Sequence, residues 1–173
     1  MAKRQRTEKL FVKAFDVLSE CPATRNGSKL IGTHDGTFHC DEALGCAMLQ
    51  MMPQWAGSTI VRTRNLEELA KCDIVIDVGA VYDHTTKRYD HHQRTFKTVL
   101  ADEHPDVAEA SRPDFTTKLS ACGLVYKHYG LTELLPALTD GSGLPTGLLP
   151  TIYKKMYKGF VEEIDAIDNV HVH

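Results

Sequence analysis

The chain has 173 residues and a mass of 19.3 kDa, which suits one domain with a hydrophobic core and is short for two. Its apolar content of 42% is ordinary for a globular protein, and its net charge of −3 argues against coating nucleic acid by charge alone. No apolar run approaches the roughly 18 residues of a membrane span, and five cysteines without a CxxC pair favour reduced intracellular thiols over disulfides or a zinc knuckle.

Residues 1–27 are predicted to form a basic, partly helical extension. Lysines and arginines cluster within its first nine residues, where a solvated tail is the plainer interpretation and a nuclear-import or nucleic-acid-contacting segment the sharper one. No signal-peptide hydrophobic stretch follows them, so secretion is not expected. The apolar spacing over residues 8–19 predicts a helix.

From residue 28 to residue 173 the pattern alternates between strands and helices. Short apolar runs predict strands over residues 29–33, 58–63, 73–79 and 88–92. Helices are predicted over residues 41–52, 65–72 with Asn65 as its cap, 118–130 with Gly130 at its end, and 148–169. Residues 98–116 and 139–147 read as loops. This order predicts an α/β domain with a doubly wound, mainly parallel sheet and helices on both faces.

Histidines and aspartates gather where the predicted strands end, at the edge where parallel sheets bind ligands. The first cluster runs from His34 through His39 to Asp41. Asp77 ends the apolar run of the third predicted strand, where an unpaired buried carboxylate would be costly, so a cation partner is expected. The other candidates are the triplet Asp90-His91-His92 and, on one face of the last helix, Asp165 and Asp168.

Mixed imidazole and carboxylate ligands suit manganese, with zinc or magnesium as alternatives. Two cations about 3.5–4 Å apart need a bridging carboxylate, for which Asp77 is the natural candidate. Taken singly, His34, Asp77 or the His91-His92 pair can each be an ordinary polar loop residue or ion-pair partner. Three strand ends with the same ligand chemistry favour a metal site. Cys40 lies inside the first cluster, but a catalytic thiol there is the weaker interpretation.

The Asp90-His91-His92 triplet, together with the upstream cluster and Asp77, resembles the signature of the DHH phosphoesterase superfamily. A longer likeness, to the Myg-type exonuclease family, runs from about residue 30 to residue 169. It is carried by the segments GTHDGTFHCDEALGCAML, CDIVIDVG, RYDHHQRTF, KLSACGLVYKHYG and YKGFVEEIDAIDN. The superfamily's first motif has two aspartates, and His39 stands in the place of the first of them.

The resemblance implies a two-cation centre. One cation would be held by His34, His39 and Asp77. The second would be held by Asp41, Asp77, His91 and a late aspartate, for which Asp168 is preferred to Asp165.

The resemblance also implies roles around the centre. Asp90 would orient His91 and fix its tautomer. His92 would face the scissile phosphate, Arg94 would clamp a phosphate, and Ser120 would meet substrate phosphate near a helix start.

The expected activity is that of a manganese-dependent phosphodiesterase, implied by the resemblance to be an RNA exonuclease of the nucleus or mitochondrion. A pyrophosphate or nucleotide phosphohydrolase is the alternative enzyme. Family members continue into a second domain that closes over the substrate, and this chain is expected to lack it. A non-catalytic metal-binding domain is therefore the alternative outside the enzymes.

Overall fold

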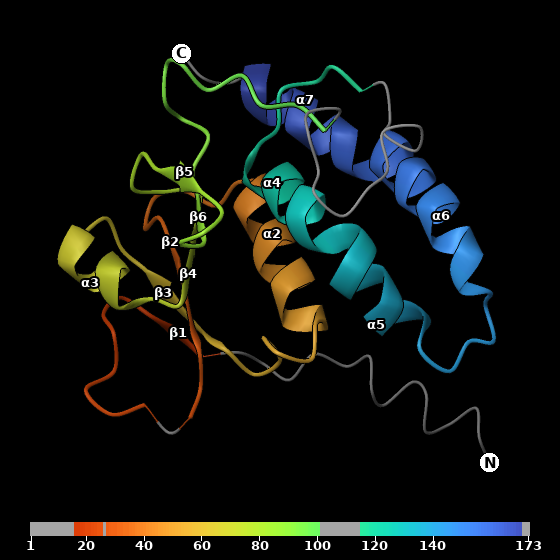
Figure 1. Cartoon of the computed structure of the whole chain (residues 1–173). Helices are drawn as coiled ribbons and strands as arrows, with labels where there is room; N and C mark the ends of the chain where they lie inside the picture. Colours follow the sequence, from red (N-terminus) through yellow and green to blue (C-terminus); the bar gives the residue numbers. More distant parts are fainter. Residues whose placement is uncertain (1–15, 26, 101–114, 171–173) are drawn as a thin grey trace.

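The computed structural model describes residues 16–25, 27–100 and 115–170 (Figure 1). Its centre is a six-stranded sheet in the order β1-β3-β2-β4-β6-β5. All neighbouring strands are parallel except the β5–β6 pair, which is antiparallel. The strands are β1 (Val17–Leu18), β2 (Leu30–Thr33), β3 (Thr59–Arg62), β4 (Ile74–Ile76), β5 (Tyr82–Asp83) and β6 (Arg88–Tyr89). The predicted α/β class and mainly parallel sheet are confirmed.

Helices connect and cover the strands. They are α2 (Cys40–Met51), α3 (Leu66–Lys71), α4 (Ala121–Tyr129), α5 (Leu135–Thr139), α6 (Leu149–Met156) and α7 (Glu162–Val170), with π-helical turns over Gly130–Leu134 and Tyr157–Val161 and a short 3₁₀ turn over Thr146–Leu148. Figure 1 shows α3 on one side of the sheet and α2, α4 and the C-terminal helices on the other. Among the described residues, no helix is both long and apolar enough to cross a bilayer.

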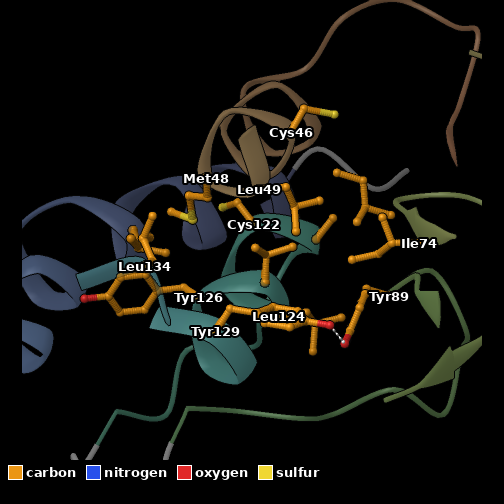
Figure 2. Packing of buried hydrophobic residues seen from close by; sticks show 14 of the residues in the cluster. Cys46, Met48, Leu49, Ile74, Tyr89, Cys122, Leu124, Tyr126, Tyr129 and Leu134 are labelled. Carbon is orange, nitrogen blue, oxygen red and sulfur yellow. Dashed lines mark hydrogen bonds between the residues drawn. The ribbon is translucent and has the colours of Figure 1, made fainter. Parts of the chain in front are cut away.

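The two faces of the sheet have separate apolar clusters, because neighbouring residues of a strand point to opposite faces. Ile31 of β2 joins the larger cluster under α2 and α4, whereas its neighbour Leu30 joins the smaller one under α3. Figure 2 shows the larger cluster, in which Leu49 of α2 and Leu124 of α4 pack near the sheet. The hydroxyls of Tyr89 and Tyr129 lie 2.8 Å apart and tie β6 to α4.

Most predicted elements are present with shifted ends, and two predictions are wrong. Val17 and Leu18 form a strand that pairs with β3, so the helix predicted over residues 8–19 does not extend through them. Pairing with a sheet edge outweighs a local helical pattern there. Gly130 does not end a helix either, because it keeps helical dihedrals (φ −58°, ψ −50°) and the chain continues into a π-helical turn.

Residues 1–15 and 26 of the predicted N-terminal extension and most of the loop predicted over residues 98–116 lie outside the described residues.

Candidate metal centre

Three parallel strands deliver the predicted residues to one edge of the sheet. His34 follows β2, Asp77 follows β4 and the triplet beginning at Asp90 follows β6. Parallel pairing brings the carboxyl ends of these strands together, which is why residues more than fifty positions apart meet. Two helices complete the site: the start of α2 supplies His39 and Asp41, and the last turns of α7 supply Asp168.

Asp77 lies at the middle of the site. Its φ is 59°, a left-handed conformation that aspartate tolerates better than most residues, and it turns the chain sharply after β4. One carboxylate oxygen lies 3.2 Å from Nε2 of His34 and the other 3.2 Å from Nε2 of His91. The carboxylate therefore stands between two imidazoles, as a bridging ligand would.

Three groups of side chains have the spacing of cation ligands, and they share members. They are His34, His39, Glu42 and Asp77; Asp77, His91 and His92; and His39, Asp41 and Asp168. Nε2 of His91 also lies 3.2 Å from an Asp168 oxygen and 3.8 Å from an Asp41 oxygen. The predicted ligands are thus brought together around one point.

Buried polar atoms without partners support a fit to cations. Nε2 of His34 and Oδ1 of Asp41 are buried and have no hydrogen bond among the described residues. Leaving such atoms unsatisfied is costly, and a cation would satisfy both. The backbone N–H of Gly36 donates to Nδ1 of His34 over 3.1 Å. Ligation through Nε2 would place the ring proton on Nδ1, so this contact would have to be exchanged for another.

The two central carboxylates have opposite pKa shifts. Burial, together with the charges of Asp77 and Asp168, raises the pKa of Asp41 to about 9. Burial also acts to raise the pKa of Asp77, but the close imidazoles of His34 and His91 outweigh burial and lower that pKa to about 2. Opposite shifts of this kind arise where buried carboxylates crowd together, because ionising one of them disfavours ionising its neighbour.

Asp90 pairs with His92 and not with His91, which corrects the prediction. Its Oδ1 lies 2.6 Å from Nδ1 of His92 and accepts the backbone N–H of His92 over 3.0 Å. Its other oxygen accepts the N–H of Ala80. The hydrogen bond to Asp90 raises the pKa of His92 against the opposing effect of burial. Neighbouring side chains of an extended chain point to opposite sides, whereas side chains two residues apart share a side. The Asp90 carboxylate therefore lies beside His92.

The two late aspartates have different surroundings. Asp165 is fully buried and accepts hydrogen bonds from the backbone N–H and hydroxyl of Ser120 and from the hydroxyl of Tyr157. Asp168 instead reaches His91. Asp165 thereby anchors α7 to the start of α4, and this anchoring sets where Asp168 lies.

The structure does not bring Ser120 or Arg94 to the cleft as predicted. Ser120 is fully buried, and its hydroxyl donates a hydrogen bond to Asp165. Arg94 is exposed and does not line the cleft over the candidate ligands.

Glu42 and Arg64 are at the site and were missed. Glu42 accepts the N–H of His39, a capping arrangement signalled by its place three residues after that histidine. Arg64 follows β3, so the strand-end rule that selected the other residues also points to it.

The cleft over these residues has two adjoining hollows that share His39 and His92. One, of about 510 Å³, is lined by His34, Asp77 and Arg64 together with apolar residues that include Leu66 and Val78. The other, of about 330 Å³, reaches Ile164 and Ile167 of α7.

The chain is an α/β domain with a candidate metal centre, because histidine and carboxylate groups with the spacing of cation ligands lie at the strand ends of its sheet. Comparison with known proteins shows the family to which this domain belongs. The MYG1 exonuclease family, described as "Uncharacterised protein family (UPF0160)", matches residues 30–172, and the chain belongs to this family.

Its relatives include proteins of animals and fungi. The chain is 52% identical over 139 residues to the MYG1 exonuclease of Mus musculus, covering 80% of the chain and 34% of the relative. It is 48% identical over 153 residues to the MYG1 exonuclease of Homo sapiens, covering 86% and 39%. A MYG1 protein of Caenorhabditis elegans is 45% identical over 142 residues, covering 82% and 39%. The chain thus spans 34–39% of these relatives' length. No solved structure matches it.

Proposed function

We propose that this domain is the catalytic part of a phosphodiesterase that uses two divalent cations to cut nucleic acid. The observation that carries the proposal is the Asp77 carboxylate, whose two oxygens each lie 3.2 Å from a different ligand-type imidazole. The name exonuclease, which four of the relatives bear, supports a nucleic-acid substrate. The likeness to DHH phosphoesterases is part of the same proposal.

Seven side chains are assigned as ligands. The first cation would be held by His34, His39, Asp77 and, as an addition from the geometry, Glu42. The second would be held by Asp41, Asp77, His91 and Asp168.

Manganese suits this mixture of imidazole and carboxylate, and magnesium is the alternative. Bound cations lower the pKa of a water molecule and neutralise charge on phosphoryl oxygens.

His92 supplies the protein's own proton at the cleft. Asp90 accepts from its Nδ1, which leaves Nε2 available for substrate, and the side chain is 44% exposed. Because the pKa of His92 is raised, its imidazolium can hold a proton at Nε2 and donate it to a phosphate oxygen. Asp90 is then a positioning residue that fixes the ring and stabilises its charge.

RNA as the natural substrate and a nuclear or mitochondrial location belong to the proposal and rest on the resemblance. Cleavage of a 5′-labelled RNA oligonucleotide by the purified chain with added Mn²⁺ tests the activity. Parallel assays with the matching DNA and with pyrophosphate separate a nuclease from a small-molecule phosphohydrolase.

Two variants assign the activity to this site. Asp77→Asn and His91→Ala should abolish Mn²⁺-dependent cleavage, since each removes a central ligand. Arg25→Ala serves as a control, because Arg25 pairs with Asp73 in an exposed ion pair that does not line the cleft. Full cleavage by Asp77→Asn would exclude this site. A folded wild-type chain that binds Mn²⁺ but cleaves none of the three substrates would favour a metal-binding domain instead.

A further inference from the structure

The two hollows of the cleft share His39 and His92, but isoleucines of α7 line one of them and Arg64 lines the other. We infer that the substrate lies across these imidazoles, with one nucleoside in the apolar hollow beside α7 and the next phosphate of the strand beside Arg64. This inference rests on the proposed function and deepens it, because it says which part of a nucleic acid each half of the cleft binds.

The apolar hollow has the composition of a small-ligand pocket. Its lining joins Ile164, Ile167 and Cys40 to the ligand-type residues His39, Asp41, Asp168 and His92. Its volume of about 330 Å³ lies at the low end of the roughly 300–1,000 Å³ usual for such pockets. Ile164, Ile167 and Asp168 occupy one face of α7 at spacings of three and four residues. A group held by the cations at Asp168 would therefore have its neighbour against the isoleucines.

A nucleoside fits this hollow better than a second phosphate does. Among the described residues, the lining has three carboxylate- or sulfur-bearing side chains, two imidazoles and two isoleucines but no lysine or arginine. A base and sugar have apolar faces that isoleucine side chains can cover, and burying apolar area drives such binding.

The other hollow differs by having an arginine in its lining. Arg64 lines it together with His34 and Asp77, and the side chain is 64% exposed. Nε of Arg64 lies 3.2 Å from Asp35, and a side-chain carbon placed at Gly36 would lie 3.3 Å from its terminal nitrogen. Asp35 and Gly36 thus lie against the guanidinium of Arg64, which keeps further N–H groups to donate to an anion. Arginine is suited to phosphate because its planar fork donates two parallel hydrogen bonds.

Alkylation of Cys40 can report whether a ligand occupies the apolar hollow, and this measurement does not depend on turnover. It is the exposed member of the five cysteines, three others are buried, and the half-buried Cys21 can be removed as Cys21→Ser. In the Mn²⁺-loaded Cys21→Ser protein, the alkylation rate of Cys40 by N-ethylmaleimide is measured by mass spectrometry. The probes are adenosine monophosphate, inorganic phosphate and the dinucleotide pApA with a 5′ phosphate.

Adenosine monophosphate should slow alkylation at least fivefold at concentrations where inorganic phosphate has no such effect. Ile167→Asp should raise the concentration needed for protection by roughly tenfold or more. Val170→Asp is the matched control, since Val170 is an exposed residue of the same helix that does not line the hollow. Equal protection by phosphate and adenosine monophosphate would overturn the nucleoside site, as would unchanged protection in Ile167→Asp.

Arg64 is tested with the dinucleotide. The extra phosphate should make it protect Cys40 at lower concentration than adenosine monophosphate does, and Arg64→Ala should remove that advantage. Arg25→Ala, which alters another exposed Arg–Asp pair, should keep it. An advantage that survives in Arg64→Ala would refute the phosphate assignment.

The outcomes are distinguishable from failure of the proposed function. Mn²⁺-dependent cleavage without nucleotide protection of Cys40 would contradict this inference and leave the proposed function standing. Protection of Cys40 without any cleavage would contradict the proposed function and leave a nucleotide-binding site.

Discussion

Replacing Gly123 by alanine sets two effects of opposite sign against each other. Gly123 lies inside α4, where exchanging glycine for alanine ordinarily stabilises a helix by about 1 kcal/mol. At this position, however, a side-chain carbon would lie 2.4 Å from both carboxylate oxygens of Asp165. No real carbon atom approaches that closely, so the carboxylate must move away.

The displacement should outweigh the gain in helix propensity. Asp165 accepts three hydrogen bonds of 2.8–2.9 Å from Ser120 and Tyr157 in a fully buried setting. Each buried donor left unsatisfied costs about 1–3 kcal/mol. Loss of two of these hydrogen bonds at about 2 kcal/mol each, against the gain of about 1 kcal/mol, leaves Gly123→Ala less stable by about 3 kcal/mol, a fall in Tm of about 6–12 °C.

Urea unfolding followed by circular dichroism measures this difference. Gly159→Ala is the matched control, because Gly159 is an exposed helical glycine whose added carbon would meet nothing within 4 Å. The control should be as stable as the parent protein or slightly more so. Because Asp165 anchors the helix that carries Asp168, Gly123→Ala should also bind Mn²⁺ more weakly. A Gly123→Ala protein as stable as the Gly159→Ala control would refute the reasoning.

Further predictions concern the cations, pH and a helix cap. Asp77→Asn should weaken Mn²⁺ binding by about 100-fold or more in calorimetry, since it removes the bridging charge; unchanged affinity would remove Asp77 from the centre. Burial and neighbouring carboxylates raise the pKa of Asp41 to about 9, so Mn²⁺ binding at pH 7 should release a proton, detectable as a dependence of the binding heat on buffer ionisation. Because this folded-state pKa lies above the unfolded value of about 3.9, the cation-free protein should lose stability as pH rises from about 4 to about 9, and urea midpoints that rise over that window would contradict the assignment. Asp90→Asn should lower the pKa of His92, measurable by NMR titration, because the hydrogen bond to Asp90 raises it. Asn65→Ala should cost about 1 kcal/mol of unfolding free energy, since the Asn65 side chain accepts the N–H of the second residue of α3.

Much of the candidate site could be read from the order of residues. His34 and Asp77 follow apolar runs that are too short for helices, and such runs predict buried strands. Once the strands are parallel, the residues after them must share an edge. The same rule applies to Arg64 after β3, but a guanidinium is not a cation ligand and so does not belong to a predicted metal site.

Contacts between elements could not be read in this way. The assignment of Asp90 to His92 depends on the turn after β6, and the burial of Ser120 depends on how α7 packs against α4. Val17–Leu18 became a strand because the edge of β3 was available for pairing. Each of these outcomes depends on a partner far away in the chain, about which local periodicity carries no information.

The amino-acid order alone determined the alternation of strands and helices, and therefore which end of the sheet carries histidines and aspartates. Only the tertiary structure decided which carboxylate meets which imidazole, that Asp165 serves α4 while Asp168 reaches His91, and that one half of the cleft is apolar. The physical reason is that hydrophobic periodicity is a local property of the chain, whereas ångström-scale distances between side chains are set by the packing of whole elements.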